Sequence, residues 1–339
     1  MARKQKVKPK SKASKRRKRV LGLRYTRLAR VILVVPALTV IAVSVLVILS
    51  DKPDPVTQTA RTIAAPRTPT PELTYTNQLS RVPSVVQLAV PNQVAAVSPL
   101  PVWQMNAVEL ALATRQPMIA IVIDDMGVDR SRSRLTVALQ GPLTLAYLAY
   151  AGDLAAQTRA ARAAGHELLV HVPMEPSNAN TDPGPYALLA DLTSSELVRR
   201  IDWNLNQFKG YVGINNHMGS KATSDRVTMR AVMAELRERG LLFLDSRTSS
   251  KTVAQEEAVK AGIPALRRDV FIDHDPSPIA VRAALLDLEN VAYQQGYAIA
   301  IGHPRDATIG ALSEWLPDVH SRGFAIVPVS AIALNLMSR

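Results

Sequence analysis

Short apolar runs recur at regular intervals between residues 118 and 329, and segments with helical periodicity separate most of them. Each run is four to six residues long, the usual length of a buried strand. The runs are Met118–Ile123, Leu143–Leu148, Glu167–Val172, Tyr211–Ile214, Leu241–Leu244, Arg268–Ile272, Tyr297–Ile301 and Phe324–Val329. The amphipathic segments are Leu154–Ala164, Ser194–Phe208, Arg226–Arg239, Ser277–Gln295 and Ile309–Ser321. This alternation predicts an α/β domain over residues 117–339 with a mostly parallel sheet and outer helices.

Glycines mark the expected ends of several of these helices. Gly165, Gly240 and Gly296 each follow a segment of helical periodicity directly, where a helix C-terminus favours glycine. About eight strands in some 220 residues suit a closed or partly closed (β/α) barrel, and a doubly wound open sheet is the alternative. Trp103–Arg115 is expected to form a short helix leading into the domain.

An uncharged apolar segment precedes the domain. Residues 31–50 contain no charged side chain, and about twenty helical residues span a bilayer core. A cleaved signal peptide is the alternative, but its apolar core is usually only about 7–15 residues long. We therefore expect a single-pass anchor in the inner (cytoplasmic) membrane. The basic flank, residues 1–30, would stay cytoplasmic and the C-terminal domain would be periplasmic or extracellular.

Residues 51–116 differ in composition from both neighbours. They are rich in Pro and Thr, with nine prolines between Pro53 and Pro101, which disfavour long helices and interior strands. This composition predicts an extended, disordered linker between the membrane and the domain.

The net charge of +13 comes from the N-terminal tail. Residues 1–30 hold 14 Lys or Arg and no acidic residue, and the remainder carries 27 basic against 28 acidic residues. A folded nucleic-acid-binding surface needs its own positive charge, so we expect no nucleic-acid partner. The basic run 16–19 would suit a nuclear signal, but that interpretation leaves the adjacent apolar segment unexplained. The chain has no cysteine, which excludes disulfides and thiolate chemistry.

Polar residues cluster where the predicted strands end. In a parallel barrel the C-terminal strand ends share one face, and active sites assemble there. The residues at these ends are Asp124, Asp125, His171, Glu175, Asn215, Asn216, His217, Asp245, Arg247, Asp269, Asp273 and His303. Each alone has a structural alternative: the aspartates can cap a helix, His171 can be a hydrogen-bonded core residue, and His303 can belong to a turn. Together they predict a functional site.

Imidazole and carboxylate groups are the ligands that zinc and other first-row divalent ions prefer. Such an ion would acidify a water and polarise a carbonyl, with a spare carboxylate as base and a histidine as acid. The sequence has neither a Gly-x-Ser-x-Gly elbow nor a phosphate-binding Gly-rich loop with Lys and Ser or Thr. A divalent-metal hydrolase is thus the chemistry that these residues favour.

Five ordered motifs resemble the divergent polysaccharide deacetylases. They are Ile-Asp-Asp, His-Val-Pro-Met-Glu-Pro, Asn-Asn-His-Met-Gly-Ser, Leu-Asp-Ser-Arg-Thr and Ile-Gly-His-Pro, and they lie between residues 123 and 304. The resemblance covers about residues 117–333. It implies a distorted (β/α) barrel of about seven strands and a divalent metal, with zinc the expected ion. It also implies an acylated cell-envelope glycan as substrate.

The resemblance also implies roles for individual residues. Asp124 corresponds to the general base, Asp125 and His171 to metal ligands, and His303 to the catalytic acid. The second histidine of the His-x-x-x-His motif is Glu175 here, and the Arg-Pro-Pro-Tyr motif of active deacetylases is missing. His217 is therefore the candidate third ligand.

Seven other residues are candidates for substrate or indirect contacts: Glu175, Asn215, Asn216, Asp245, Arg247, Asp269 and Asp273. The departures from the family pattern leave a second hypothesis open. In it, the chain is a non-catalytic envelope module that binds a glycan or a partner protein through the old cleft.

Overall fold

The computed structural model describes residues 100–110 and 116–338. The predicted basic tail, the membrane segment 31–50 and most of the linker lie outside these residues. Within the described part, no helix is both long enough and apolar enough to cross a bilayer.

Nine parallel strands form one sheet in the part of the chain that the structure describes. They are β1 (Met118–Met126), β2 (Thr144–Leu148), β3 (Glu167–Met174), β4 (Gly213–Met218), β5 (Leu242–Asp245), β6 (Ala265–Arg267), β7 (Val270–Phe271), β8 (Tyr297–Gly302) and β9 (Ala325–Ile326). The helices are α2 (Val102–Met105), α3 (Arg130–Val137), α4 (Leu154–Ala163), α5 (Ser194–Leu205), α6 (Arg226–Glu238), α7 (Ala254–Ala261), α8 (Pro278–Gln295), α9 (Asp306–Val319) and α10 (Val329–Met337), with a 3₁₀ turn at Ala222–Ser224.

The sheet curls so that its two end strands, β6 and β7, are joined directly by residues 268–269. Its strand order is β6-β5-β4-β3-β2-β1-β8-β7, so consecutive β6 and β7 stand at opposite ends. Between them, the Arg268 N–H donates to the Asp245 carbonyl at 2.9 Å and the Asp269 N–H donates to the Ile299 carbonyl at 2.8 Å. The chain thus passes from pairing with β5 to pairing with β8. This curled parallel sheet fits the predicted distorted barrel.

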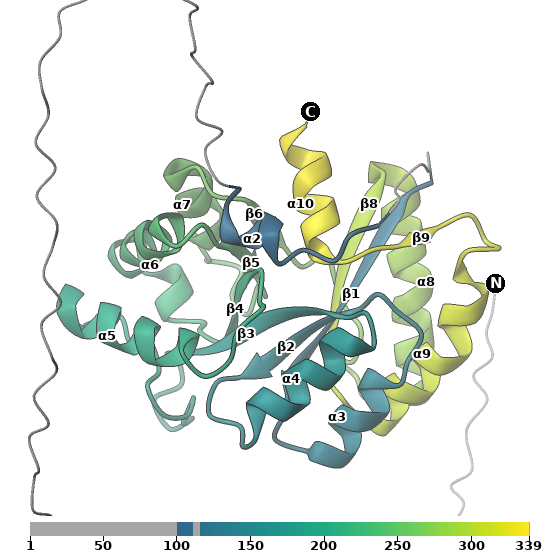
Figure 1. The fold of residues 1–339 in the computed structure, drawn as a ribbon, viewed down its shortest axis with the longest axis horizontal. Helices are drawn as coiled ribbons and strands as arrows, with labels where there is room; N and C mark the ends of the chain where they lie inside the picture. The colour runs from purple at the N-terminus through teal and green to yellow at the C-terminus, as the bar shows by residue number, and fades with distance from the viewer. Residues whose placement is uncertain (1–99, 111–115, 339) are drawn as a thin grey trace, which may run out of the picture. The chain divides into compact units, whose positions relative to one another are not determined.

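Strand β1 shows how the side chains divide between two apolar clusters. Ile119, Ile121 and Ile123 pack with the outer helices, whereas Met118, Ala120 and Val122 belong to the second cluster. Alternation of this kind is what a strand buried on both faces produces. Figure 1 shows α3, α4, α8 and α9 along one part of the sheet and α5, α6 and α7 along the other.

Helices α2 and α10 lie together at the end where the strands begin (Figure 1). Ile332 of α10 and Trp103 of α2, which is 3% exposed, both join the second cluster. The packed unit therefore includes residues N-terminal to Pro117. Of the predicted helix from Trp103 to Arg115, the structure shows only α2, and residues 111–115 lie outside the described part.

Glu167, at the start of β3, links α10 to the barrel through hydrogen bonds. Its side chain is fully buried and accepts hydrogen bonds from the Ser330 backbone N–H at 3.1 Å, from the Ser330 hydroxyl, and from the Thr144 hydroxyl at 3.4 Å. Burial raises the pKa of Glu167, although the bonds from Ser330 oppose this shift.

Replacing Glu167 by Ala should lower the free energy of unfolding by about 2–4 kcal/mol, since it leaves buried donors without an acceptor. Urea unfolding followed by circular dichroism measures this change. Exposed Glu238, replaced by Ala, is the matched control and should stay within about 0.5 kcal/mol of the parent. An equal, small effect of both substitutions would contradict the role given to Glu167.

Candidate metal centre

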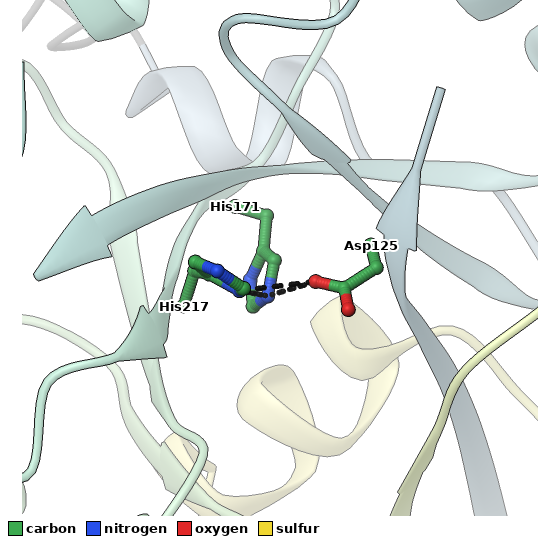
Figure 2. A group of neighbouring side chains, drawn as sticks. All are labelled: Asp125, His171 and His217. Carbon is green, nitrogen blue, oxygen red and sulfur yellow. Dashed lines mark hydrogen bonds and ion pairs between the residues drawn. The ribbon is translucent and has the colours of Figure 1, made fainter. Parts of the chain in front are cut away.

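Three side chains from three strands converge at the C-terminal face of the barrel. Asp125 stands near the end of β1, His171 lies within β3, and His217 lies near the end of β4. Asp125 Oδ1 is 3.0 Å from His217 Nδ1 and 3.3 Å from His171 Nε2, and the two nitrogens are 3.2 Å apart. Figure 2 shows the three groups pointing toward one another.

These distances suit a small cation. Zinc binds nitrogen and oxygen at about 2.0–2.2 Å, which in tetrahedral geometry separates neighbouring ligand atoms by roughly 3.3–3.6 Å. The Asp125 Oδ1 atom is buried and has no hydrogen-bond partner among the described residues, because neither imidazole nitrogen meets it with hydrogen-bond geometry. A buried carboxylate oxygen without such a partner is costly unless a cation satisfies it. The donor set therefore fits a divalent metal ion.

A neighbouring amide orients His171 for this purpose. His171 Nδ1 lies 2.8 Å from Asn215 Oδ1, while the Asn215 Nδ2 group donates to Asp124 Oδ1 at 2.6 Å. With its amide assigned in this way, Asn215 Oδ1 accepts a hydrogen bond from the His171 Nδ1–H and leaves the Nε2 lone pair facing the site. Hydrogen bonding of the far ring nitrogen is the usual way in which proteins fix a metal-binding histidine.

Electrostatics at the centre also favour a cation. Burial by itself would raise the pKa of Asp125, but the His171 and His217 rings lower it far below its usual range. Burial would lower the pKa of His171, but Asp124 and Asp125 raise it overall. The buried carboxylates thus favour positive charge nearby, which either a proton or a metal ion supplies.

The backbone is strained around this centre. Asp125, Met218 and Arg247 have positive φ angles of 56°, 54° and 52°, respectively, although none is glycine. Asp125 and Met218 stand at or next to the ends of β1 and β4, and Arg247 follows β5 by two residues. Such conformations persist only where the surrounding structure enforces them, and they concentrate at functional sites.

Asp124 is a second carboxylate beside the three converging groups. It is 3% exposed, and its Oδ2 lies 3.7 Å from His171 Nε2. Burial raises its pKa, while His171, His303 and the Asn215 hydrogen bond oppose the rise. Asp124 therefore binds a proton more readily than an exposed aspartate does, and it lies beside the candidate metal site.

His303 approaches the centre from the end of β8. Its Nδ1 lies 2.9 Å from Asp273 Oδ1, its backbone N–H donates to Asp273 Oδ2 at 2.8 Å, and Nε2 is 3.8 Å from Asp125 Oδ2. Thr308 also donates to Asp273 Oδ2, at 2.9 Å. Burial lowers the pKa of His303, but fully buried Asp273 raises it overall. The pair favours the protonated imidazole and leaves Nε2 as the ring nitrogen nearer the centre.

Asn216 and Asp245, two further candidates, form hydrogen bonds with the backbone near the strand ends instead of pointing into the centre. Asn216 Oδ1 accepts from the Ser246 N–H at 2.9 Å, and Asn216 Nδ2 donates to the Met218 carbonyl at 2.8 Å. Asp245 accepts from the Arg247 N–H at 2.7 Å and from the Thr252 hydroxyl at 2.8 Å.

Glu175 and Asp269 are occupied elsewhere. Glu175 accepts from Lys221 Nζ at 2.6 Å and from the Ala190 N–H at 2.8 Å, which ties the loop after β3 to the segment after β4. Asp269, which follows β6, accepts a hydrogen bond from the Ile299 N–H of β8 at 2.9 Å. Neither carboxylate belongs to the three-residue cluster.

A cleft of about 950 Å³ opens beside the centre. Asp125, His217 and His303 line it, together with Arg132, Tyr150 and Arg305, which sequence reasoning missed. The Arg132 guanidinium donates to both Asp306 carboxylate oxygens at 2.8 Å and to Asp129 Oδ2 at 2.8 Å, so it joins the N-terminus of α3 to that of α9. Arg132 and Asp306 are 174 residues apart, and no local pattern signals their pairing.

Comparison with known proteins identifies related chains. The family model described as "Divergent polysaccharide deacetylase" matches residues 121–333. An uncharacterized protein of Haemophilus influenzae (strain Rd) is 33% identical over 212 residues, which cover 62% of this chain and 75% of that protein. The uncharacterized protein YibQ of Escherichia coli K12 is 34% identical over 210 residues, which cover 59% of this chain and 64% of that protein.

A solved structure has a similar fold. The crystal structure of an uncharacterized protein from Agrobacterium tumefaciens C58 superposes with a TM-score of 0.67 at 29% identity. The superposition covers 69% of this chain and 95% of that one.

Proposed function

The chain belongs to the divergent polysaccharide deacetylase family, and on that premise we propose that it is a metal-dependent hydrolase that removes acetyl groups from a cell-envelope glycan. One observation carries this proposal: Asp125, His171 and His217 present three ligand atoms to one point, with Asp124 and His303 beside it. Four of these residues, Asp124, Asp125, His171 and His303, match family motif positions for base, metal ligands and acid, and His217 is the candidate for the missing histidine ligand.

A divalent ion held by Asp125, His171 and His217 would polarise the acyl carbonyl and acidify a water molecule. Asp124 accepts a proton from the attacking water, and its raised pKa makes it a better base than an exposed aspartate. Asn215 keeps the Asp124 carboxylate in position through the 2.6 Å hydrogen bond.

His303 donates a proton to the departing sugar nitrogen or oxygen. Asp273 fixes the ring through Nδ1, so that Nε2 is the atom that faces the substrate, and it raises the pKa of His303, which favours the protonated ring. Water oxygen bonds to the acyl carbon, the bond from that carbon to the sugar nitrogen or oxygen breaks, and acetate and a free amine or hydroxyl result.

The cleft supports a glycan substrate by its size and exposure. Its volume of about 950 Å³ lies at the upper end of the range of about 300–1,000 Å³ typical of ligand sites. Leu148 and Tyr150 provide apolar walls, and the Arg132 bridge shapes one rim. The proposed membrane anchor at residues 31–50 and its basic flank would place this cleft in the periplasm, next to envelope glycans.

Acetate release is the direct test. The full-length chain, loaded with Zn²⁺, should release acetate from N-acetylglucosamine oligomers or from O-acetylated peptidoglycan, and a chelator should stop the release. Acetate assayed enzymatically, with the Asp125→Ala variant as control, gives the measurement. A metal-loaded chain that releases no acetate from any acetylated glycan would contradict the proposal.

A non-catalytic module is the second candidate, and Glu175 favours it. This residue stands where the family motif has a second histidine ligand, but its carboxylate is bound to Lys221 and Ala190. In this case the metal-loaded chain should bind glycan or a partner protein without chemistry. Equilibrium binding to the same oligomers, measured alongside acetate release, separates the two candidates.

A further inference from the structure

A second, smaller hollow lies between the loop that follows β3 and helix α5. Its volume is about 330 Å³, near the lower end of the range typical of ligand sites. Asp182, Gly184 and Tyr186 line it from the loop, and Arg199 and Arg200 line it from α5. None of these residues belongs to the metal centre.

Tyr186 is the aromatic residue in its wall, and Trp203 supports it from α5. The rings of Tyr186 and Trp203 are stacked, with centroids 4.1 Å apart and planes 12° apart. Trp203 packs against the main apolar cluster from α5, whereas Tyr186 remains 37% exposed. Tyr186 also has a φ of 55°, which is unusual for a bulky residue and concentrates at functional positions. The fold therefore holds an aromatic side chain at the surface on a support that reaches the core.

Helix α5 fixes the backbone beneath this ring. The Asn204 side-chain amide donates to the Tyr186 carbonyl at 3.1 Å, and Arg200 Nη1 donates to the Ala187 carbonyl at 2.6 Å. A ring that is already held in place loses little conformational entropy when a ligand binds to it. The Tyr186–Trp203 pair is thus a preorganised contact surface.

Tyr150 joins this hollow to the larger cleft. Tyr150 lines the cleft beside the metal centre, and Gly184 lines the second hollow. The two residues are in contact, because a Cβ atom added to Gly184 would lie 2.7 Å from Tyr150 Cε1. The second hollow is therefore a neighbour of the larger cleft, with Tyr150 and Gly184 at their border.

The polar groups around the hollow balance in charge. Two carboxylates, of Asp182 and Glu196, stand against the two guanidinium groups of Arg199 and Arg200, and Glu196 binds both arginines at 2.7 Å. Asp182 is exposed and supplies carboxylate oxygens at the rim. The exposed part of the Tyr186 ring has the Arg199 guanidinium carbon 5.6 Å from its centroid and is bordered by hydrogen-bonding groups. Such a surface suits a sugar ring, which has apolar C–H faces and a rim of hydroxyls. The charge balance favours a neutral sugar over an anion.

We propose that Tyr186 and Trp203 form a distal sugar subsite, which binds a neutral sugar residue of a glycan chain whose acetylated unit lies at the metal centre. This inference rests on the proposed function for the position of the acetylated unit. It adds that the substrate is a chain of several sugars. Short fragments, which fill only the larger cleft, gain nothing from the subsite.

Binding without turnover tests the subsite. The full-length Asp124→Asn chain, loaded with Zn²⁺, is titrated calorimetrically with the hexamer and the dimer of N-acetylglucosamine. Adding Tyr186→Ala should weaken hexamer binding about five- to tenfold and leave dimer binding unchanged. Tyr186→Phe keeps the aromatic face and should bind the hexamer nearly as well as the parent does.

Tryptophan fluorescence gives a second readout, because Trp203 is stacked on Tyr186, the ring that the proposed sugar would contact. The hexamer should change the emission, the dimer should change it far less, and Trp203→Phe should remove the hexamer-specific part. Tyr293→Ala is the matched control, since this tyrosine is 78% exposed on α8 and lines neither hollow. It should leave the affinity for both oligomers unchanged.

The outcomes separate this inference from the proposed function. Acetate release together with equal losses for dimer and hexamer in Tyr186→Ala would overturn the subsite and leave the hydrolase intact. Hexamer binding that depends on Tyr186, in a chain that releases no acetate, would support the subsite and contradict the hydrolase. A hexamer that binds no more tightly than the dimer, or that does not bind, would overturn the subsite.

Discussion

Asp125→Ala should remove nearly all binding of a zinc-class ion, while the parent chain should bind about one ion per molecule. Asp125 supplies the only negative charge among the three converging ligand atoms, and its Oδ1 has no hydrogen-bond partner among the described residues. Loss of a group that only supports a ligand costs about 10–100-fold in metal affinity, so loss of a ligand itself should cost more. Elemental analysis after reconstitution with Zn²⁺ and dialysis measures the bound metal.

Glu175→Gln is the matched control for this experiment. It also removes a carboxylate on the same face of the barrel, but one held by Lys221 and Ala190, so the metal content should not change. His217→Ala should behave like Asp125→Ala. Equal metal content in the parent and in Asp125→Ala would place any bound ion elsewhere, and loss of metal in Glu175→Gln would make Glu175 a ligand.

The convergence of distant residues was accessible from the sequence because strand polarity determines it. In a parallel barrel, each residue that ends a strand arrives at the same face. Asp125 and His217 stand one residue before the ends of β1 and β4, and His171 lies in the C-terminal half of β3; the three strands lie within four positions of one another in the sheet order. The pattern of apolar runs therefore places them together without any knowledge of tertiary contacts.

The same rule does not distinguish a residue that faces the site from one that braces the loop beside it. Glu175 and Asp245 also follow strand ends, but their carboxylates accept backbone N–H groups and a neighbouring lysine or threonine. Which way such a side chain turns depends on loop donors that no periodicity encodes. Asn215 illustrates the converse: its amide joins His171 to Asp124, a role fixed by contacts 44 and 91 residues away.

Several elements also lie beyond what periodicity reveals. Helix α3 buries only Ser133 and Thr136, so it shows no apolar stripe. The predicted strand at 268–272 is wrong in its bounds, because the chain changes its pairing partner at Arg268 and Asp269 and forms two short strands instead. The run at 324–329 forms only β9 before α10 begins, since a helix buried on most sides is as apolar as a strand.

In the proposed reaction Asp124 accepts a proton and His303 donates one, and their surroundings differ in a way that suits these two roles. Asp124 is bonded to a neutral amide, whereas His303 is bonded to the fully buried carboxylate of Asp273. The first arrangement leaves a carboxylate with increased proton affinity, and the second favours an imidazolium. A pair of titratable groups whose environments differ in this way is the usual mark of acid and base assignments.

Asp124→Asn should lower the rate of acetate release by about 10²–10⁴-fold, the usual contribution of general acid–base catalysis. Asparagine has the same shape and keeps an oxygen for the bond from Asn215, so the fold and the three ligand atoms should remain in place. It offers no basic carboxylate to the attacking water. Turnover with saturating acetylated oligomer, measured on protein of verified zinc content, gives the comparison.

Metal content decides what a loss of activity in this variant means. Full zinc occupancy with lost turnover and unchanged oligomer binding identifies Asp124 as the base. Lost zinc would instead make Asp124 a ligand in addition to the three-residue cluster of Asp125, His171 and His217. Undiminished acetate release would show that another group takes the proton, since an amide side chain cannot replace a carboxylate as a base.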